Sequence, residues 1–198
     1  MVRLTTNEIE WLRQKYPLLN YDEERSCIIG PFSIDHKYGD LPRIKDTYKI
    51  RVNLLAMPNR NSYPLVYETD GRIKKIADRK KLPVYDLHVN LDNTLCLGLS
   101  ERFHEYYPNG FTLDQFFENL GSHFYWVSYF DRYNKEPWKA ELHGDDAKIE
   151  YYIEVGNIAM LRKMHKEKTG LGIAKSKLQN YLKSDRLIRM LKNKLKGK

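Results

Sequence analysis

Three strand-like segments follow one another early in the chain, with turns rather than helices between them. Residues 48–54 alternate apolar and polar side chains, a pattern typical of a strand with one buried face. Residues 26–32 form a short apolar run that ends in a turn, and residues 64–68 form another, followed by the turn pair Asp70-Gly71. Because successive strands pair with their neighbours, this order predicts an antiparallel meander and disfavours alternating βαβ units.

Helical patterns flank these strands. Capping side chains at residues 5–8 precede apolar residues at helical spacing, and Pro17 ends the pattern. Residues 112–133 carry apolar and aromatic side chains every third or fourth position, which predicts a long core helix that Gly121 bends or splits. Residues 74–87 show neither period clearly. Further helices are expected at 145–152, 156–168 and 176–195. Together the patterns indicate an α+β fold.

The positive charge of the chain is concentrated at its end. The formal net charge is +8, but residues 162–198 contain 13 lysines or arginines and only two acidic residues. The rest of the chain therefore has a net negative charge, and any argument from charge to a partner concerns residues 162–198 alone. This basic segment has too few tyrosines for a base-stacking platform, so we favour docking to a protein, or simple solvation, over nucleic acid.

Cysteine usage and hydropathy indicate the compartment. The chain has two cysteines, too few for a disulfide framework, and no Cys-x-x-Cys pair for zinc. No apolar stretch is long enough to span a membrane, and the first ten residues lack the apolar run of a signal peptide. We therefore expect a cytoplasmic protein. Cys27 lies in an apolar strand and is expected in the core.

Cys96 is the candidate nucleophile. It follows a polar loop that contains His88 and Asn90, and a thiol in such surroundings can become a reactive thiolate. The alternative is an inert core cysteine, because Leu95 and Leu97 on either side are typical of a buried segment.

Five short motifs around this cysteine keep a fixed order along the chain. They are YP at 63–64, HVN at 88–90, NTLCLG at 93–98, PW at 137–138 and LHG at 142–144. This series, over roughly residues 25–152, resembles the ubiquitin-conjugating enzymes and specifically their bacterial relatives. The chain departs from the family pattern at four points. Val89 stands where the family has proline, and Asn93 where glycine is usual. The spacing from Asn90 to Cys96 is shorter than in the eukaryotic members, and Pro137 and Trp138 stand in the reverse order.

The resemblance implies a ubiquitin-conjugating-enzyme-like α+β catalytic domain over residues 1–155 and a basic helical extension over 156–198. It implies that Cys96 accepts a protein C-terminus as a thioester and delivers it to a lysine, without metal or organic cofactor. A separate ATP-dependent activating enzyme is expected, because no GxxxxGK[ST] phosphate loop is present. The implied cargo is a ubiquitin-like protein or a cGAS-like nucleotidyltransferase, as for the standalone conjugating enzymes of CBASS-type antiviral operons.

Four polar residues are candidates to assist Cys96. The resemblance suggests Asn90 as donor to the oxyanion, although asparagine also caps turns. His88 is expected to order the loop rather than act as a base. Asp92 is a candidate to orient or deprotonate the incoming lysine. His143 is a second candidate proton acceptor, or else the first residue of a helix.

Three other functions stay open at this point. The first is a non-catalytic adaptor of the same fold, in which Cys96 is buried and inert. The second is a hydrolase that pairs Cys96 with His88 or His143 and releases its substrate to water. The third is a nucleic-acid-binding module that uses the basic segment, whose affinity would fall steeply with salt.

Overall fold

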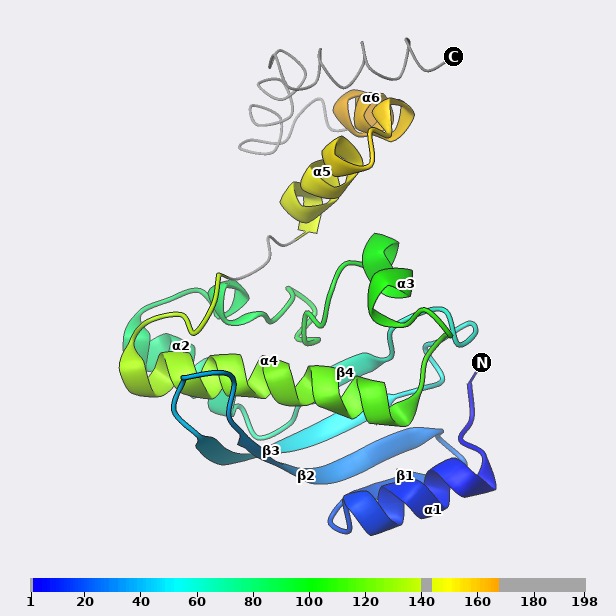
Figure 1. The fold of residues 1–198 in the computed structure, drawn as a ribbon, viewed down its shortest axis with the longest axis vertical. Helices are drawn as coiled ribbons and strands as arrows, with labels where there is room; N and C mark the ends of the chain where they lie inside the picture. The colour runs from blue at the N-terminus through cyan, green and yellow to red at the C-terminus, as the bar shows by residue number, and fades with distance from the viewer. Residues whose placement is uncertain (1, 140–143, 168–198) are drawn as a thin grey trace. The chain divides into compact units, whose positions relative to one another are not determined.

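A computed structural model describes residues 2–139 and 144–167. The chain forms two compact units, Met1–Ala140 and Glu141–Lys198. The proposed extents of a catalytic domain and a basic extension, 1–155 and 156–198, remain predictions, and the helix expected at 176–195 lies outside the described residues. The elements of Figure 1, in chain order, are α1 (Thr6–Lys15), β1 (Asn20–Asp22), β2 (Cys27–His36), β3 (Ile44–Asn53), β4 (Leu65–Glu68), α2 (Arg72–Lys80), the 3₁₀ helices η1 (Val84–Leu87) and η2 (Ser100–Arg102), α3 (Phe103–Tyr106), α4 (Leu113–Tyr133), α5 (Gly144–Glu154) and α6 (Ile158–Glu167).

The sheet is an antiparallel meander of four strands in the order β1-β2-β3-β4, which confirms the predicted strand succession and the α+β class. The short first strand was not predicted. The register places Ile28 opposite Val52, and Val52 opposite Val66, so one row of apolar side chains crosses three strands on the buried face. The alternate positions of β2 and β3 are mainly exposed, as the period of two requires.

The segment 74–87, for which no element was predicted, forms helix α2 and the 3₁₀ helix η1. Gly71 caps the start of α2 in a left-handed conformation, so the Asp70-Gly71 pair begins a helix and does not close a hairpin. Ile73, Ile76 and Ala77 are buried, at helical spacing. Lys74 and Lys75 lie between Ile73 and Ile76, and these charged neighbours concealed the apolar stripe.

Helix α4 covers the buried face of the sheet and is the centre of the core (Figure 1). The ring of Phe124 stacks on Tyr48 of β3 with 4.1 Å between ring centroids, and Phe117 lies 5.4 Å from Phe32 of β2. Residues Leu113–Tyr133 form one continuous helix, so of the two predicted effects of Gly121, to bend or to split the helix, the split is wrong. The aromatic stripe has a packing role, as predicted.

Helix α1 begins with the capping box that its sequence predicts. The Thr5 hydroxyl accepts from the backbone N–H of Glu8, and the Glu8 carboxylate accepts from the backbone N–H of Thr5 at 2.8 Å. The helix packs on the same core, because Tyr16 lies 4.6 Å from Phe117 between ring centroids.

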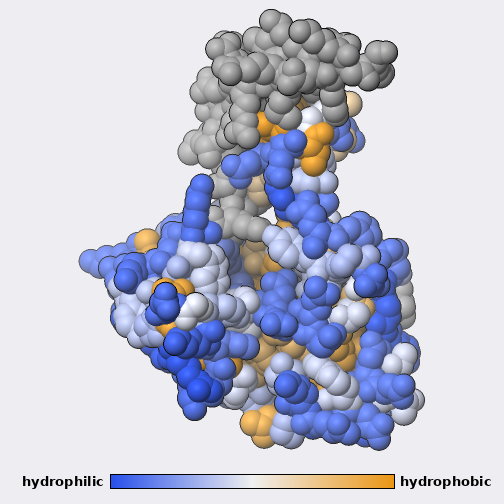
Figure 2. All heavy atoms as spheres, viewed as in Figure 1, coloured by the Kyte–Doolittle hydropathy of each residue, from blue (hydrophilic) through white to orange (hydrophobic). Residues whose placement is uncertain are grey.

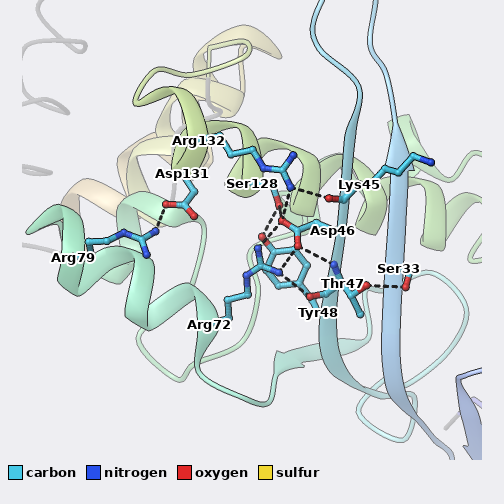
Figure 3. A network of polar contacts seen from close by, with 10 residues as sticks. All are labelled: Ser33, Lys45, Asp46, Thr47, Tyr48, Arg72, Arg79, Ser128, Asp131 and Arg132. Carbon is cyan, nitrogen blue, oxygen red and sulfur yellow. Dashed lines mark hydrogen bonds and ion pairs between the residues drawn. The ribbon is translucent and has the colours of Figure 1, made fainter.

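A polar network joins β3, α2 and α4 (Figure 3). The carboxylate of Asp46 on β3 accepts hydrogen bonds from Arg72 of α2, from the Ser128 hydroxyl of α4 at 2.9 Å and from Arg132 of α4 at 3.2 Å. The guanidinium of Arg72 also lies over the ring of Tyr48, 4.4 Å from its centroid. The Asp46 side chain is only 11% exposed, so a largely buried carboxylate joins both helices to the sheet.

The second unit, as far as it is described, is a pair of helices with a small core of its own. The buried residues of this core are Ile149, Tyr152, Ile153, Leu161 and Met164. Gly156 has a positive φ in the turn, and the Asn157 side chain accepts from the backbone N–H of Met160 at 3.2 Å, which caps α6. The two helical segments predicted here are confirmed.

The face drawn in Figure 2 is mainly hydrophilic, with small groups of hydrophobic residues between the hydrophilic ones. Among the residues that the structure describes, the most exposed large apolar residue is Leu91, at 97%. Within the described residues, no helix combines the length and the hydrophobicity that crossing a bilayer requires.

Candidate functional site

The cysteine loop is a tightly hydrogen-bonded turn anchored to the sheet. Val89 and Leu95 form an isolated antiparallel bridge, and the backbone N–H of Cys96 donates to the carbonyl of His88 at 2.8 Å. The backbone N–H of Leu95 donates to the carbonyl of Val66 on β4 at 2.7 Å. Since Val89 and Leu95 are both buried, these two apolar residues hold the loop, while Asn90, Leu91 and Asp92 lie at its tip.

Side chains at the tip form a short hydrogen-bonded chain. The amide of Asn90 donates to the Thr94 hydroxyl at 3.0 Å, and this hydroxyl donates to the Asp92 carboxylate at 2.6 Å. Asp92 also accepts from the backbone N–H of Thr94 at 3.0 Å. The side-chain hydrogen bond from Thr94, reinforced by the backbone one, lowers the pKa of Asp92 below its ordinary value. Asp92 is therefore a carboxylate at neutral pH and a weak base.

His88 lies where the loop leaves η1 and packs against α4. Its ring meets Trp126 edge-on with 4.6 Å between centroids, and His123 lies 5.9 Å away. The residue has a left-handed backbone with φ of 60°, which fits a cap at the end of a 3₁₀ helix. These contacts favour the loop-ordering role of His88 over a role as base.

The two cysteines lie in different environments. Cys27 is 5% exposed, and burial raises the pKa of its thiol, so its predicted place in the core is confirmed. Cys96 is only partly buried. Neither forms a disulfide. The cysteine that the motif series selects is thus the more accessible of the two.

Leu97 and Gly98, which follow Cys96, contact two segments that are distant in the sequence. The Asn119 side chain of α4 donates to the carbonyl of Leu97 at 3.2 Å. Gly98 has a φ of 146°, a conformation essentially restricted to glycine, and a Cβ there would lie 2.6 Å from the Tyr63 hydroxyl. Two of the motifs, YP at 63–64 and the end of NTLCLG, therefore meet in space.

One hydrogen-bonded loop accordingly carries four of the five candidate residues: His88, Asn90, Asp92 and Cys96. The fifth, His143, lies outside the described residues. Asn119 was missed because its only sequence signal is a polar residue within an aromatic helix. No group of three or more potential metal-ligating side chains occurs within residues 2–139 and 144–167.

Comparison with known proteins gives no relative: no protein-family model, curated protein or solved structure matches the chain. Any assignment of function therefore depends on the loop itself.

Replacing Gly98 by alanine is expected to lower the free energy of unfolding by about 2 kcal/mol, because a side chain there meets both backbone strain and the Tyr63 hydroxyl. Urea unfolding measures the loss. The companion substitution Tyr63→Phe removes the hydroxyl that the new methyl group would strike. In that background the loss from Gly98→Ala is expected to be smaller, and equal losses in both backgrounds would contradict the proposed contact.

Proposed function

We propose that this protein is an acyl carrier of the ubiquitin-conjugating type, in which Cys96 holds a protein C-terminus as a thioester and passes it to a lysine amine. The observation that carries the proposal is the placement of Cys96. Cys96, a residue that is only partly buried, directly follows a hydrogen-bonded loop that is anchored to β4 and packed on α4. The order of N-terminal helix, antiparallel meander, cysteine loop and long helix also supports the ubiquitin-conjugating fold.

The chemistry needs two displacements at one carbonyl carbon. The Cys96 thiolate attacks a C-terminus that a separate ATP-dependent enzyme has activated, a C–S bond forms and the activating group leaves. A lysine amine then attacks the thioester, the C–N bond forms and the C–S bond breaks. The electron pair of that bond returns to the Cys96 sulfur, and the proton of the amine passes to water. Both steps develop negative charge on the same carbonyl oxygen.

Asn90 and Asp92 have distinct parts in this proposal. An asparagine amide has two N–H groups, and the hydrogen bond to Thr94 occupies one of them. The other remains for the oxyanion. Because hydrogen bonds from Thr94 hold Asp92 in its ionised form, it suits attraction and orientation of a lysine ammonium better than removal of its proton.

The cargo is proposed from the motif resemblance and its chemistry. A protein with a free C-terminus is required, either a ubiquitin-like protein or a cGAS-like nucleotidyltransferase, in a bacterial antiviral setting. Conjugation in the cytoplasm and a protein-docking role for the basic segment 162–198 belong to the same proposal.

Reactivity of the two cysteines gives the first test. Native protein treated with iodoacetamide is expected to be alkylated at Cys96 and protected at Cys27, as peptide mapping by mass spectrometry would show. Cys27 is the matched control, because it becomes reactive only when urea unfolds the chain. A native Cys96 as unreactive as Cys27 would favour the adaptor function and contradict the proposal.

Acyl transfer gives the second test, with p-nitrophenyl acetate as a cargo-independent donor. Wild-type protein and Cys27→Ala are expected to release p-nitrophenolate and to carry an acetyl thioester that L-lysine discharges faster than water does. Cys96→Ala should form no such adduct. Discharge by water at the same rate as by lysine would indicate a hydrolase instead.

In cells, Cys96→Ser is expected to trap a hydroxylamine-resistant ester with its cargo.

A further inference from the structure

Asn119 links α4 to the segment that follows Cys96. Its side-chain amide donates to the carbonyl of Leu97 at 3.2 Å and to the hydroxyl of Tyr107 at 3.3 Å. A carbonyl oxygen can only accept, so the NH₂ group of the amide must face Leu97. Both N–H groups of this amide are thereby engaged, and the orientation of the side chain is fixed.

The backbone around Cys96 is in this way held at two points. The N–H of Cys96 donates to the carbonyl of His88 at 2.8 Å on one side, and the carbonyl of Leu97 accepts from Asn119 on the other. Because a peptide unit is planar, fixing the Leu97 carbonyl also fixes the plane that leads into Gly98. The half-buried Asn119 stands on a long core helix, which makes it a rigid support.

We propose that Asn119 is a positioning residue for Cys96, an inference that rests on the proposed acyl-carrier function. By holding the Leu97–Gly98 peptide, one residue after the nucleophile, Asn119 keeps the thioester in one orientation while the amine attacks. Orientation of reacting groups before the chemical step lowers the barrier that remains. Asn119 makes no contact with substrate in this proposal and acts through the backbone.

The experiment compares four full-length variants with the wild-type protein. Asn119→Ala removes both hydrogen bonds, and Asn119→Asp keeps the shape but turns an acceptor toward the Leu97 carbonyl. Tyr107→Phe removes only the second acceptor. Ser122→Ala is the matched control, because Ser122 lies on the same helix and bonds elsewhere, to the Tyr38 hydroxyl at 2.7 Å.

Acetyl-Cys96, formed with p-nitrophenyl acetate, is discharged with L-lysine over a range of lysine concentrations. Both Asn119 variants are expected to lower kcat about fivefold, the change that one neutral hydrogen bond is worth, with KM for lysine unchanged. Tyr107→Phe and Ser122→Ala should stay close to wild type. Discharge by the Asn119 variants at the wild-type rate, or an equal loss in Ser122→Ala, would overturn the proposal.

Alkylation of Cys96 by iodoacetamide separates this proposal from the function on which it rests. The Asn119→Ala variant is expected to react about threefold faster than wild type, because the released segment exposes the thiol more often. If wild-type protein forms no acetyl thioester, the acyl-carrier function fails while alkylation still reports on positioning. An unchanged alkylation rate in Asn119→Ala would reject the role of Asn119 in either case.

Discussion

Replacing Asp46 by alanine is expected to lower the free energy of unfolding by about 3 kcal/mol. The carboxylate accepts hydrogen bonds from Arg72, Ser128 and Arg132, and its removal leaves the guanidinium of Arg72, which lies over the Tyr48 ring, without its counter-charge. This expected loss in the free energy of unfolding is at the low end of the range for breaking a buried ion pair, because the Arg72 side chain is still 33% exposed. Urea unfolding at neutral pH, monitored by circular dichroism, measures the difference.

The same substitution gives a pH dependence with a definite sign. Burial alone would raise the pKa of Asp46, but the hydrogen bonds from Arg72 and Ser128 outweigh it and lower the pKa below 3.8. A lowered pKa in the folded state contributes stability above the unfolded pKa and loses it as pH falls through the folded one. The difference between wild type and Asp46→Ala is therefore expected to be complete at pH 7 and to shrink below about pH 4.

Asp35 on the neighbouring strand is the matched control. It also pairs with two basic side chains, Arg43 and Lys45, but its side chain is 41% exposed. Water and salt screen such a pair, so Asp35→Ala should leave stability almost unchanged at every pH. Equal losses from Asp35→Ala and Asp46→Ala would show that the network does not fasten α2 and α4 to the sheet.

Replacing Gly30 by alanine is expected to lower the free energy of unfolding by about 3 kcal/mol as well. The chain between α1 and β1 passes directly over this residue of β2, and a Cβ would lie 2.3 Å from the carbonyl oxygen of Leu18. The φ of 146° adds strain for any residue with a side chain. To remove the clash, the backbone at Leu18 would have to move. This movement is costly in free energy, because the adjacent Leu19 is buried and its backbone N–H donates to the carbonyl of Tyr16.

Thermal unfolding followed by circular dichroism measures this loss. Gly39→Ala is the control, because a side chain there meets open space. A melting temperature that falls no further in Gly30→Ala than in Gly39→Ala would contradict the close approach of the two segments.

Local patterns predicted most of the elements. The alternation at 48–54 predicted β3, the apolar spacing at 112–133 predicted α4, and the capping side chains at 5–8 predicted the start of α1. Each of these signals lies within a single element. It depends on which face of that element is apolar, or on which side chains hydrogen-bond the free backbone N–H groups of its first turn. The strand at 20–22 is too short to show such a pattern, and it exists because β2 offers a partner.

In the candidate site, too, only neighbours in the sequence could be predicted. The series His88, Asn90, Asp92 and Cys96 could be recognised because all four residues lie within nine consecutive positions. Asn119 was not predicted, and neither was the contact of Tyr63 with Gly98, although Tyr63 belongs to the YP motif. Both residues meet the cysteine segment only after α4 and the region before β4 have packed around it.

The sequence by itself determined the strand order, the amphipathic helices and the place of the cysteine loop, since these depend on residues close together in the chain. Only the tertiary structure decided that Asp46 joins two helices, that Gly30 lies against the Leu18 carbonyl and that Asn119 holds the Leu97–Gly98 peptide. Each of these contacts links segments that are distant in the sequence, and their side chains acquire a partner only when burial of the core brings those segments together.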